Sequence, residues 1–249
     1  RNAFTIMVSM IAMIVAIPAY SASYLMISDL GSSAEMIRRG NVEGFSSGSN
    51  AIFENPASLY RVNKISTSVF SSKIMTEADY RNISLAFKTG VGTIGVGYMD
   101  AGVEGIERTA RDSDTDIITG TGEMFGYKNR IIKIGYQKSL SKDFHVGVNG
   151  VGYINEIEYY MGTGYSLDAG LIYEFNELTV SLFARNIIPT KVKYSDSTDP
   201  TYSGEETLPL QTVFGLAYPF GDLNIMGQFK FDGTNSLMSA GLDYTPEFL

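Results

Sequence analysis

The stretch Tyr165-Ser-Leu-Asp-Ala-Gly-Leu-Ile-Tyr173 decides the fold class, because apolar and polar residues alternate along it. Successive side chains of a β-strand point to opposite faces of the sheet. One face would therefore carry the odd-numbered residues of the stretch, which are all aromatic or aliphatic. The other face would carry Ser166, Asp168, Gly170 and Ile172. This pattern predicts a strand with one apolar and one mostly polar face.

The same alternation recurs from residue 66 onward and predicts about ten strands, long enough to cross a membrane when tilted. The predicted strands cover residues 66–74, 80–88, 92–100, 129–138, 144–156, 165–174, 178–188, 210–218, 222–232 and 236–245. No long apolar run follows residue 28, so no transmembrane helix is expected in this part of the chain. We therefore expect an all-β fold, an antiparallel transmembrane β-barrel.

The predicted connections alternate between short and long. The short connections cover residues 89–91, 139–143, 175–177 and 219–221. The long connections cover residues 101–128, 157–164 and 189–209. Short turns at one rim and long loops at the other are typical of outer-membrane barrels.

The composition agrees with a barrel and excludes several other classes. Charged residues make up only 18% of the chain, which is low for a soluble surface, and Tyr, Phe and Gly are plentiful. The absence of Trp departs from the usual aromatic belt. Since Cys is absent, disulfides and thiolate metal sites are excluded. The net charge of -8 argues against nucleic acid as a partner.

Charged residues near strand centres indicate which face points inward. A Lys or Arg facing lipid at mid-membrane costs roughly 2–4 kcal/mol. The lumen is therefore expected to hold the side chains of Lys133, His145, Asp168, Arg185 and Lys230. The same faces also carry four apolar residues, Val151, Ile172, Phe183 and Met226. Such a mixed wall suits a hydrophobic or amphiphilic ligand, or a barrel packed with side chains.

Residues 1–22 have the pattern of a signal peptide, with Arg1 before an apolar stretch and small residues near Ser21. A retained membrane anchor is the alternative, although the apolar core is shorter than a full span of about 20 residues. The first residue is not Met, and residues 245–249 read as a turn rather than a final aromatic strand. We therefore expect residues to be missing at both ends.

Residues 31–60 combine the spaced glycines Gly40, Gly44 and Gly48 with the motif Asn55-Pro56-Ala57. This arrangement resembles the opening of FadL-like outer-membrane proteins, and it is most similar to their PorV/PorQ-type or related branch. The resemblance implies a hatch that plugs the barrel at residues 23–65, and a barrel at 66–249. An ordinary irregular loop is the alternative. Because the family's barrels have more strands than predicted here, this barrel is expected to be incomplete at its C-terminal end.

Three candidate functions remain open in the bacterial outer membrane, with membrane lipid as a partner, and the resemblance implies the first two. The first is passive uptake of hydrophobic or amphiphilic small molecules through the plugged barrel. The second is PorV-type binding of client proteins of a secretion system, using residues 101–128 and 189–209. The third is a structural or antigenic surface barrel without transport.

Two motifs that suggest enzymes do not have the expected surroundings. Gly44-Phe-Ser46-Ser-Gly48 matches an esterase motif that needs a preceding strand, a following helix and a partner His. The only histidine, His145, lies in a strand pattern. Gly90-Val-Gly92-Thr-Ile-Gly95 matches a dinucleotide fingerprint but leads into a strand, not a helix. We predict neither an enzyme nor a cofactor.

An acidic stretch resembles a calcium loop in its spacing. Asp112, Asp114, Asp116 and Glu123 fall at the first, third, fifth and twelfth positions of such a loop. The sixth position is Ile117, where the sharp turn needs Gly. A solvated acidic loop is therefore the main interpretation, with a calcium site as the weaker one.

Overall fold

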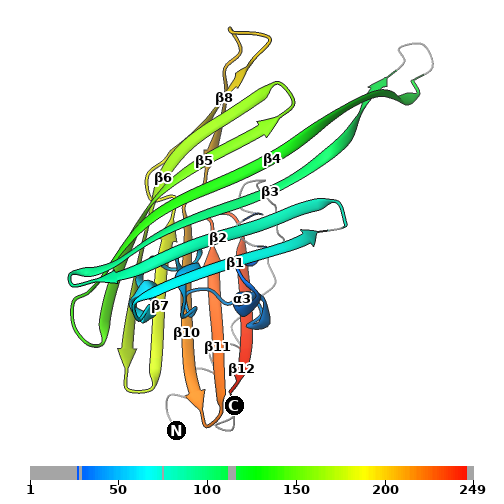
Figure 1. Cartoon of the computed structure of the whole chain (residues 1–249). Coiled ribbons are helices and arrows are strands. Elements are labelled where there is room, and N and C mark those ends of the chain that lie inside the picture. The colour runs from blue at the N-terminus through cyan, green and yellow to red at the C-terminus, as the bar shows by residue number, and fades with distance from the viewer. Residues whose placement is uncertain (1–26, 28–29, 75, 112–115, 246–249) are drawn as a thin grey trace.

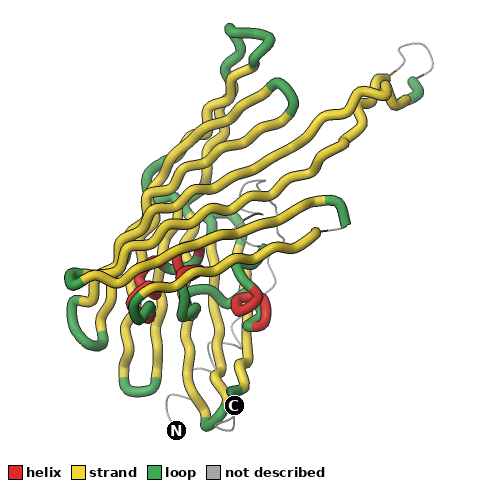
Figure 2. Tube along the Cα trace, in the orientation of Figure 1, coloured by secondary structure: helices red, strands yellow, loops and turns green. Residues whose placement is uncertain are grey.

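The computed structural model describes residues 27, 30–74, 76–111 and 116–245. Its main element is one antiparallel sheet of twelve strands, curved around a segment with three short helices (Figures 1 and 2). The strands are β1 Ile65–Ile74, β2 Ala78–Thr89, β3 Gly92–Arg111, β4 Ile118–Ser139, β5 Phe144–Ile157, β6 Tyr160–Phe175, β7 Leu178–Arg185, β8 Thr190–Asp196, β9 Gly204–Leu208, β10 Gln211–Phe220, β11 Leu223–Phe231 and β12 Ser236–Tyr244. Among the described residues, no helix has the length and apolar character needed to cross a bilayer.

The sheet follows the order β1-β2-β3-β4-β5-β6-β7-β10-β11-β12, and β8 pairs with β6 and β9. Tight turns join β2 to β3, β4 to β5, β6 to β7 and β10 to β11, and they define what we call the turn end of the sheet. The opposite end carries the long extensions of β3 and β4, which project from the sheet (Figure 1). We call it the extended end.

All ten strands expected from the alternation are present, but the predictions of long connections at residues 101–128, 157–164 and 189–209 were wrong. Residues 101–128 are not a loop, because β3 continues to Arg111 and β4 begins at Ile118. The predicted loop at residues 189–209 contains β8 and β9, and only two residues separate β5 from β6. These extensions lack a clear apolar stripe because much of both faces is exposed, so periodicity could not identify them.

The two faces of the sheet differ as the alternation predicted. On β6, Tyr165 is 85% exposed on the convex face, while the neighbouring Ser166 is 4% exposed. On β4, Ile134 is 62% exposed and Lys133 is 3% exposed. The convex face thus presents many large apolar side chains, far more than a soluble protein normally exposes.

An inner segment, residues 30–64, lies against the concave face (Figure 2). It contains α3 Ala34–Arg38 and the 3-10 helices η1 Ser49–Phe53 and η2 Pro56–Arg61. Ile52, Phe53 and Leu59 of this segment belong to an apolar cluster that also includes strand residues such as Met99 and Ile131. The core of the protein therefore lies between the inner segment and the sheet.

Candidate functional site

The concave face has a row of glycines where the inner segment rests. At Gly97 of β3, an added Cβ would lie 2.7 Å from the Phe53 ring, closer than such atoms approach. At Gly147 of β5, it would overlap the backbone of Pro56 and Ala57. Similar overlaps with the inner segment occur at Gly170 and Gly241, and a Cβ at Gly215 would lie 3.0 Å from the Phe45 ring. These glycines form a seat, which we call the glycine seat, because only hydrogen in place of a side chain leaves room for the segment.

The motif Asn55-Pro56-Ala57 joins the inner segment to β6 and β7. The Asn55 Oδ1 accepts a hydrogen bond from the Ala57 N–H at 2.9 Å and so caps η2. The Asn55 Nδ2 donates to the Ser181 Oγ at 2.9 Å and to the Leu171 carbonyl at 3.1 Å. Pro56 occupies the first turn of η2, where its missing N–H costs nothing. One asparagine therefore fixes both the helix start and its position on the sheet.

The three glycines predicted in the hatch differ in conformation. Gly40 and Gly44 have φ values of +66° and +89°, which favour glycine. A Cβ at Gly40 would also overlap the Ala240 carbonyl of β12. Gly48 instead has φ −115°, an extended conformation that other residues adopt readily. A tight bend is therefore found at Gly40 and Gly44 but not at Gly48.

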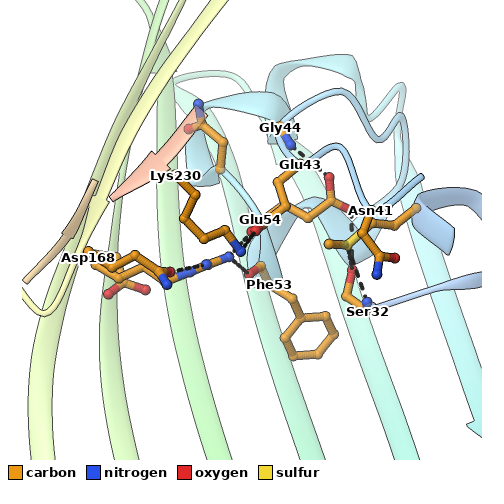
Figure 3. A network of polar contacts seen from close by, with 12 residues as sticks. Ser32, Asn41, Glu43, Gly44, Phe53, Glu54, Asp168 and Lys230 are labelled. Carbon is orange, nitrogen blue, oxygen red and sulfur yellow. Dashed lines mark hydrogen bonds and ion pairs between the residues drawn. The ribbon is translucent and has the colours of Figure 1, made fainter. Parts of the chain in front are cut away.

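A buried ionic network holds the middle of the inner segment against the sheet. The Glu43 carboxylate forms ion pairs with Arg185 of β7 and Lys230 of β11 (Figure 3). Arg185 also donates to the Gln211 Oε1 at 2.6 Å and to the Phe53 carbonyl at 3.0 Å. The Glu43, Arg185 and Lys230 side chains are at most 6% exposed. The network thus ties two strands to the inner segment away from water.

A second buried pair lies on neighbouring strands. The Lys133 Nζ of β4 lies 2.7 Å from the Asp168 Oδ2 of β6. The Asp168 Oδ1 accepts a hydrogen bond from the Asn186 N–H at 3.2 Å. Both ions are compensated locally, as buried charges in proteins require.

Two glutamates of the inner segment titrate in opposite directions. Burial raises the pKa of Glu43, but the adjacent Arg185 and Lys230 outweigh it and hold the pKa below its usual range. Burial raises the pKa of Glu54 to about 7, although the Ser46 hydroxyl and the Gly44 N–H donate to this carboxyl group. The Gly44 N–H lies 2.9 Å from the Glu54 Oε2 (Figure 3). Glu43 is therefore ionised at neutral pH, whereas Glu54 changes its charge near neutrality.

His145 lies apart from this network, near the turn end. Its ring stacks on Tyr60 of η2 with centroids 3.6 Å apart, and its Nδ1 lies 2.8 Å from the Ser139 Oγ. The Tyr60 hydroxyl donates to Glu174 of β6. This contact fixes the end of η2 on β5 and β6.

Of the five residues predicted to face the lumen, four thus form the two buried ion-pair groups and His145 stands separately. Sequence reasoning did not identify Glu43 or Glu54. A charge balance could have found them, since three inward cations were predicted with a single inward carboxylate, Asp168. Buried charges need partners, so a further carboxylate had to come from another segment.

The calcium prediction falls mostly outside the described residues, which exclude Asp112 and Asp114. Asp116 forms an ion pair with Arg111 at 2.7 Å, and Glu123 lies 3.3 Å from Arg108. Across the described ranges, no three His, Cys, Asp or Glu residues converge in a manner that could hold a metal. The calcium site stays a prediction.

A surface pocket of about 610 Å³ lies between the extended ends of β3, β4 and β5. Its charged side chains already have partners: Arg108 pairs with Glu158 and Glu123, the Lys128 Nζ lies 2.5 Å from Glu104, and Glu156 pairs with Arg130 outside the pocket. The pocket does not include any residue of the inner segment. We therefore place the candidate site at the buried interface and not in this pocket.

The two enzyme-like motifs have structural explanations. Ser46 donates its hydroxyl to the Glu54 carboxyl group at 2.5 Å, within the inner segment. Gly90 and Gly92 form the turn between β2 and β3, and the residues after them continue as a strand.

No protein-family profile and no curated protein matches this chain. Among solved structures, the toluene transporter TbuX of Ralstonia pickettii has a TM-score of 0.54 and 13% identity, covering 89% of this chain and 80% of that chain. The toluene transporter TodX of Pseudomonas putida has a TM-score of 0.57 and 10% identity, covering 85% and 76%. Identities this low show the fold alone. They confirm the all-β antiparallel FadL-like barrel fold and do not distinguish the PorV/PorQ branch.

Proposed function

We propose that this chain is a bacterial outer-membrane barrel that lets hydrophobic small molecules pass, with residues 23–65 as its hatch. The single observation that carries the proposal is the arrangement of the described part of that hatch. It rests on the concave face of a sheet whose convex face is apolar. A barrel wall with a hatch on its inner face separates two compartments, and its apolar outer face needs lipid around it.

The distribution of charge supports the placement in a membrane. Lys133, Arg185 and Lys230 lie on the concave face and are paired with carboxylates there. The convex face carries large apolar side chains, among them Ile134, Tyr165 and Leu242. In water such a surface would aggregate, whereas lipid tails solvate it. The apolar convex face is therefore the surface that contacts outer-membrane lipid.

Two observations support the class of ligand. The structural neighbours TbuX and TodX are toluene transporters by name. The concave face of this chain carries an apolar cluster that includes Met99, Ile131 and Val151. An apolar inner wall binds a hydrocarbon better than a sugar or an ion, because it offers no hydrogen bonds in return for lost hydration.

The test is uptake by intact Gram-negative cells that lack their own hydrophobic uptake barrels. Toluene crosses simple phospholipid bilayers unaided, so the lipopolysaccharide barrier of the outer membrane must be present. Cells that make the whole protein should take up radiolabelled toluene several-fold faster than cells without it. Their sensitivity to large polar antibiotics, a control for general leakage, should stay unchanged. Equal toluene uptake, or a protein that stays dissolved without detergent, would refute the proposal.

The described structure does not favour the protein-docking or the structural alternative. Residues 101–128 and 189–209 are largely strands in the described structure, and the solved neighbours are transporters by name. Nothing among the described residues indicates a secretion-system client.

A further inference from the structure

We infer that a patch on the concave face of the sheet selects uncharged ligands that combine an apolar body with a hydroxyl or N–H donor. The inference rests on the proposed function and narrows its substrate class. The site is a patch of four residues, Asn82, Met99, Ile131 and Asn155. We call it the amide-bordered patch.

The patch spans four adjacent strands. In the sheet register, Asn82 of β2 pairs with Met99 of β3, and Met99 pairs with Ile131 of β4. Ile131 pairs with Tyr153 of β5, and Asn155 follows two residues later on the same face. The four patch residues are only 2–3% exposed. An apolar centre is thus bordered by an amide group on each side.

Each of the two amides has an oxygen without a hydrogen-bond partner in the described structure. The Asn82 Nδ2 donates to the Ser32 carbonyl at 2.9 Å and to the Tyr80 hydroxyl at 3.1 Å. Since a carbonyl can only accept, this contact fixes which amide atom is the nitrogen. The Asn82 Oδ1 is therefore a buried acceptor with no donor among the described residues.

The second acceptor is arranged similarly. The Asn155 Nδ2 donates to the Asn129 Oδ1 at 3.0 Å and to the Tyr127 hydroxyl at 3.3 Å. Its Oδ1 is buried and has no hydrogen-bond partner in the part of the chain that the structure describes. Native proteins seldom leave buried acceptors unpaired, because the lost hydration is not regained. A ligand donor would restore the missing bond at either asparagine.

The patch offers no counter-charge for an anionic ligand. None of its four residues is charged, and the nearby buried Lys133 is already paired with Asp168. Arg185 and Lys230 are paired with Glu43. A carboxylate would lose its hydration there without an available cation, whereas a neutral alcohol or phenol would not.

A ligand bound at the patch exchanges with residues of this chain that pack in the same apolar cluster. Ile27 and Leu30 pack in the same apolar cluster as Met99 and Ile131. The Tyr80 hydroxyl donates to the Ile27 carbonyl at 3.3 Å, a long hydrogen bond. Because this hydrogen bond is long, a ligand whose apolar body is similar in size to the Ile27 side chain can replace that residue in the cluster.

The first test compares three ligands that share one apolar body: toluene, p-cresol and p-toluate. Equilibrium binding to the whole protein in detergent is measured, with empty micelles as the blank for each ligand. Sites that hydrogen-bond a ligand discriminate strongly against analogues without the group. We expect p-cresol to bind at least about tenfold more tightly than toluene, and p-toluate to bind weakest. Equal binding of toluene and p-cresol, or tighter binding of p-toluate, overturns the inference.

The second test uses the variants Asn155→Leu and Asn82→Leu. Combined in one protein, they should reduce the preference for p-cresol over toluene to below about threefold while toluene binding stays within about twofold, since p-cresol loses both acceptors and toluene bonds to neither. The variants also remove the amide donor bonds to Ser32, Tyr80, Asn129 and Tyr127, so an unchanged circular dichroism spectrum is required before binding is compared. The matched control is Ser166→Ala, on the same face, whose hydroxyl already donates to the Ile188 carbonyl at 3.4 Å. The control should keep the preference. If a variant does not fold, the ligand series on the unaltered protein still decides.

The outcomes separate this inference from the proposed function. Toluene binding without a preference for p-cresol refutes the inference alone. No binding of any of the three ligands, together with no toluene uptake by cells, refutes both.

Discussion

The two ends of β3 and β4 have the same hydrogen-bonded ladder but different surroundings. Toward the turn end, Gly95 and Gly97 lie beneath the inner segment and β3 is paired on both sides. Toward the extended end, β2 no longer pairs with β3 beyond Gly102, and β5 no longer pairs with β4 beyond Tyr127. There the two strands form an isolated ribbon with two register shifts (Figure 1).

The pairing of β3 with β4 runs through both ends, so the ends differ in what surrounds this pair: flanking strands and the inner segment at the turn end, and neither of them at the extended end. The turn end, which we call the seated end because the inner segment packs there, combines close packing, capped helices and buried ion pairs. Each of these features is costly to disturb. The ribbon keeps ion pairs that water already solvates. We therefore expect stability and gating to depend on the seated end, and we rank the following changes by expected effect.

The largest effect is expected for Glu43→Gln. The change leaves Arg185 and Lys230 buried without their carboxylate, which should cost about 3–5 kcal/mol. Urea unfolding in detergent micelles measures the loss. The control is Glu104→Gln on the ribbon, where the carboxylate is 68% exposed and pairs with Lys128. Similar losses for both variants would contradict the distinction between the two ends.

Gly147→Val should destabilise by about 3 kcal/mol and unseat η2, because overpacking against backbone cannot relax easily. Unseating is detected as faster protease cleavage within residues 30–64. The matched control is Gly152→Val on the same strand, where an added Cβ meets nothing within 4 Å. If cleavage of the two variants were equal, the glycine seat would not position the segment.

The stability should also depend on pH through Glu54. Its pKa in the folded protein is about 7, above the ordinary value of 4.5. The protonated form is therefore favoured by folding, so this contribution is complete below pH 4.5 and is lost as the pH rises through 7. The change amounts to about 3 kcal/mol at most. Glu54→Gln should flatten the stability profile in this window, and an unchanged slope would exclude Glu54 as its source.

Asn55→Ala removes the cap of η2 and the bonds to β6 and β7. It should cost about 1–2 kcal/mol and loosen the hatch, because the Ala57 N–H loses its acceptor while the Ser181 Oγ and the Leu171 carbonyl lose a donor. Uptake of radiolabelled toluene by cells should rise measurably with this variant, alone or combined with Pro56→Ala, because a loosened hatch obstructs the barrel less. Uptake identical to that of the unaltered protein would argue against residues 30–64 as the gate.

The smallest effect is expected for Arg108→Ala on the ribbon. Arg108 pairs with Glu123 and Glu158 but is 37% exposed, so its loss should cost less than about 1 kcal/mol. The same urea titration measures it. A loss as large as that of Glu43→Gln would show that the ribbon contributes to the stability of the seated end.

The sequence by itself determined the strands and their two faces. Alternation is a local property, so Lys133, Asp168 and Arg185 could be assigned to one face without knowing the fold. The extensions of β3 and β4 escaped prediction because exposure on both faces leaves no apolar stripe to detect.

Only the tertiary structure decided which residues of the inner segment and of the strands come into contact on the concave face. The Glu43 N–H donates to the Gln228 side chain, 185 residues away in sequence. Pro56 packs against Gly147, which also lies far from it in sequence. Such long-range contacts depend on how the inner segment packs onto the sheet, which no local sequence pattern encodes. The glycine seat, the partners of Glu43 and the burial that shifts Glu54 all follow from that return, because close packing and desolvation arise only when the two surfaces come together.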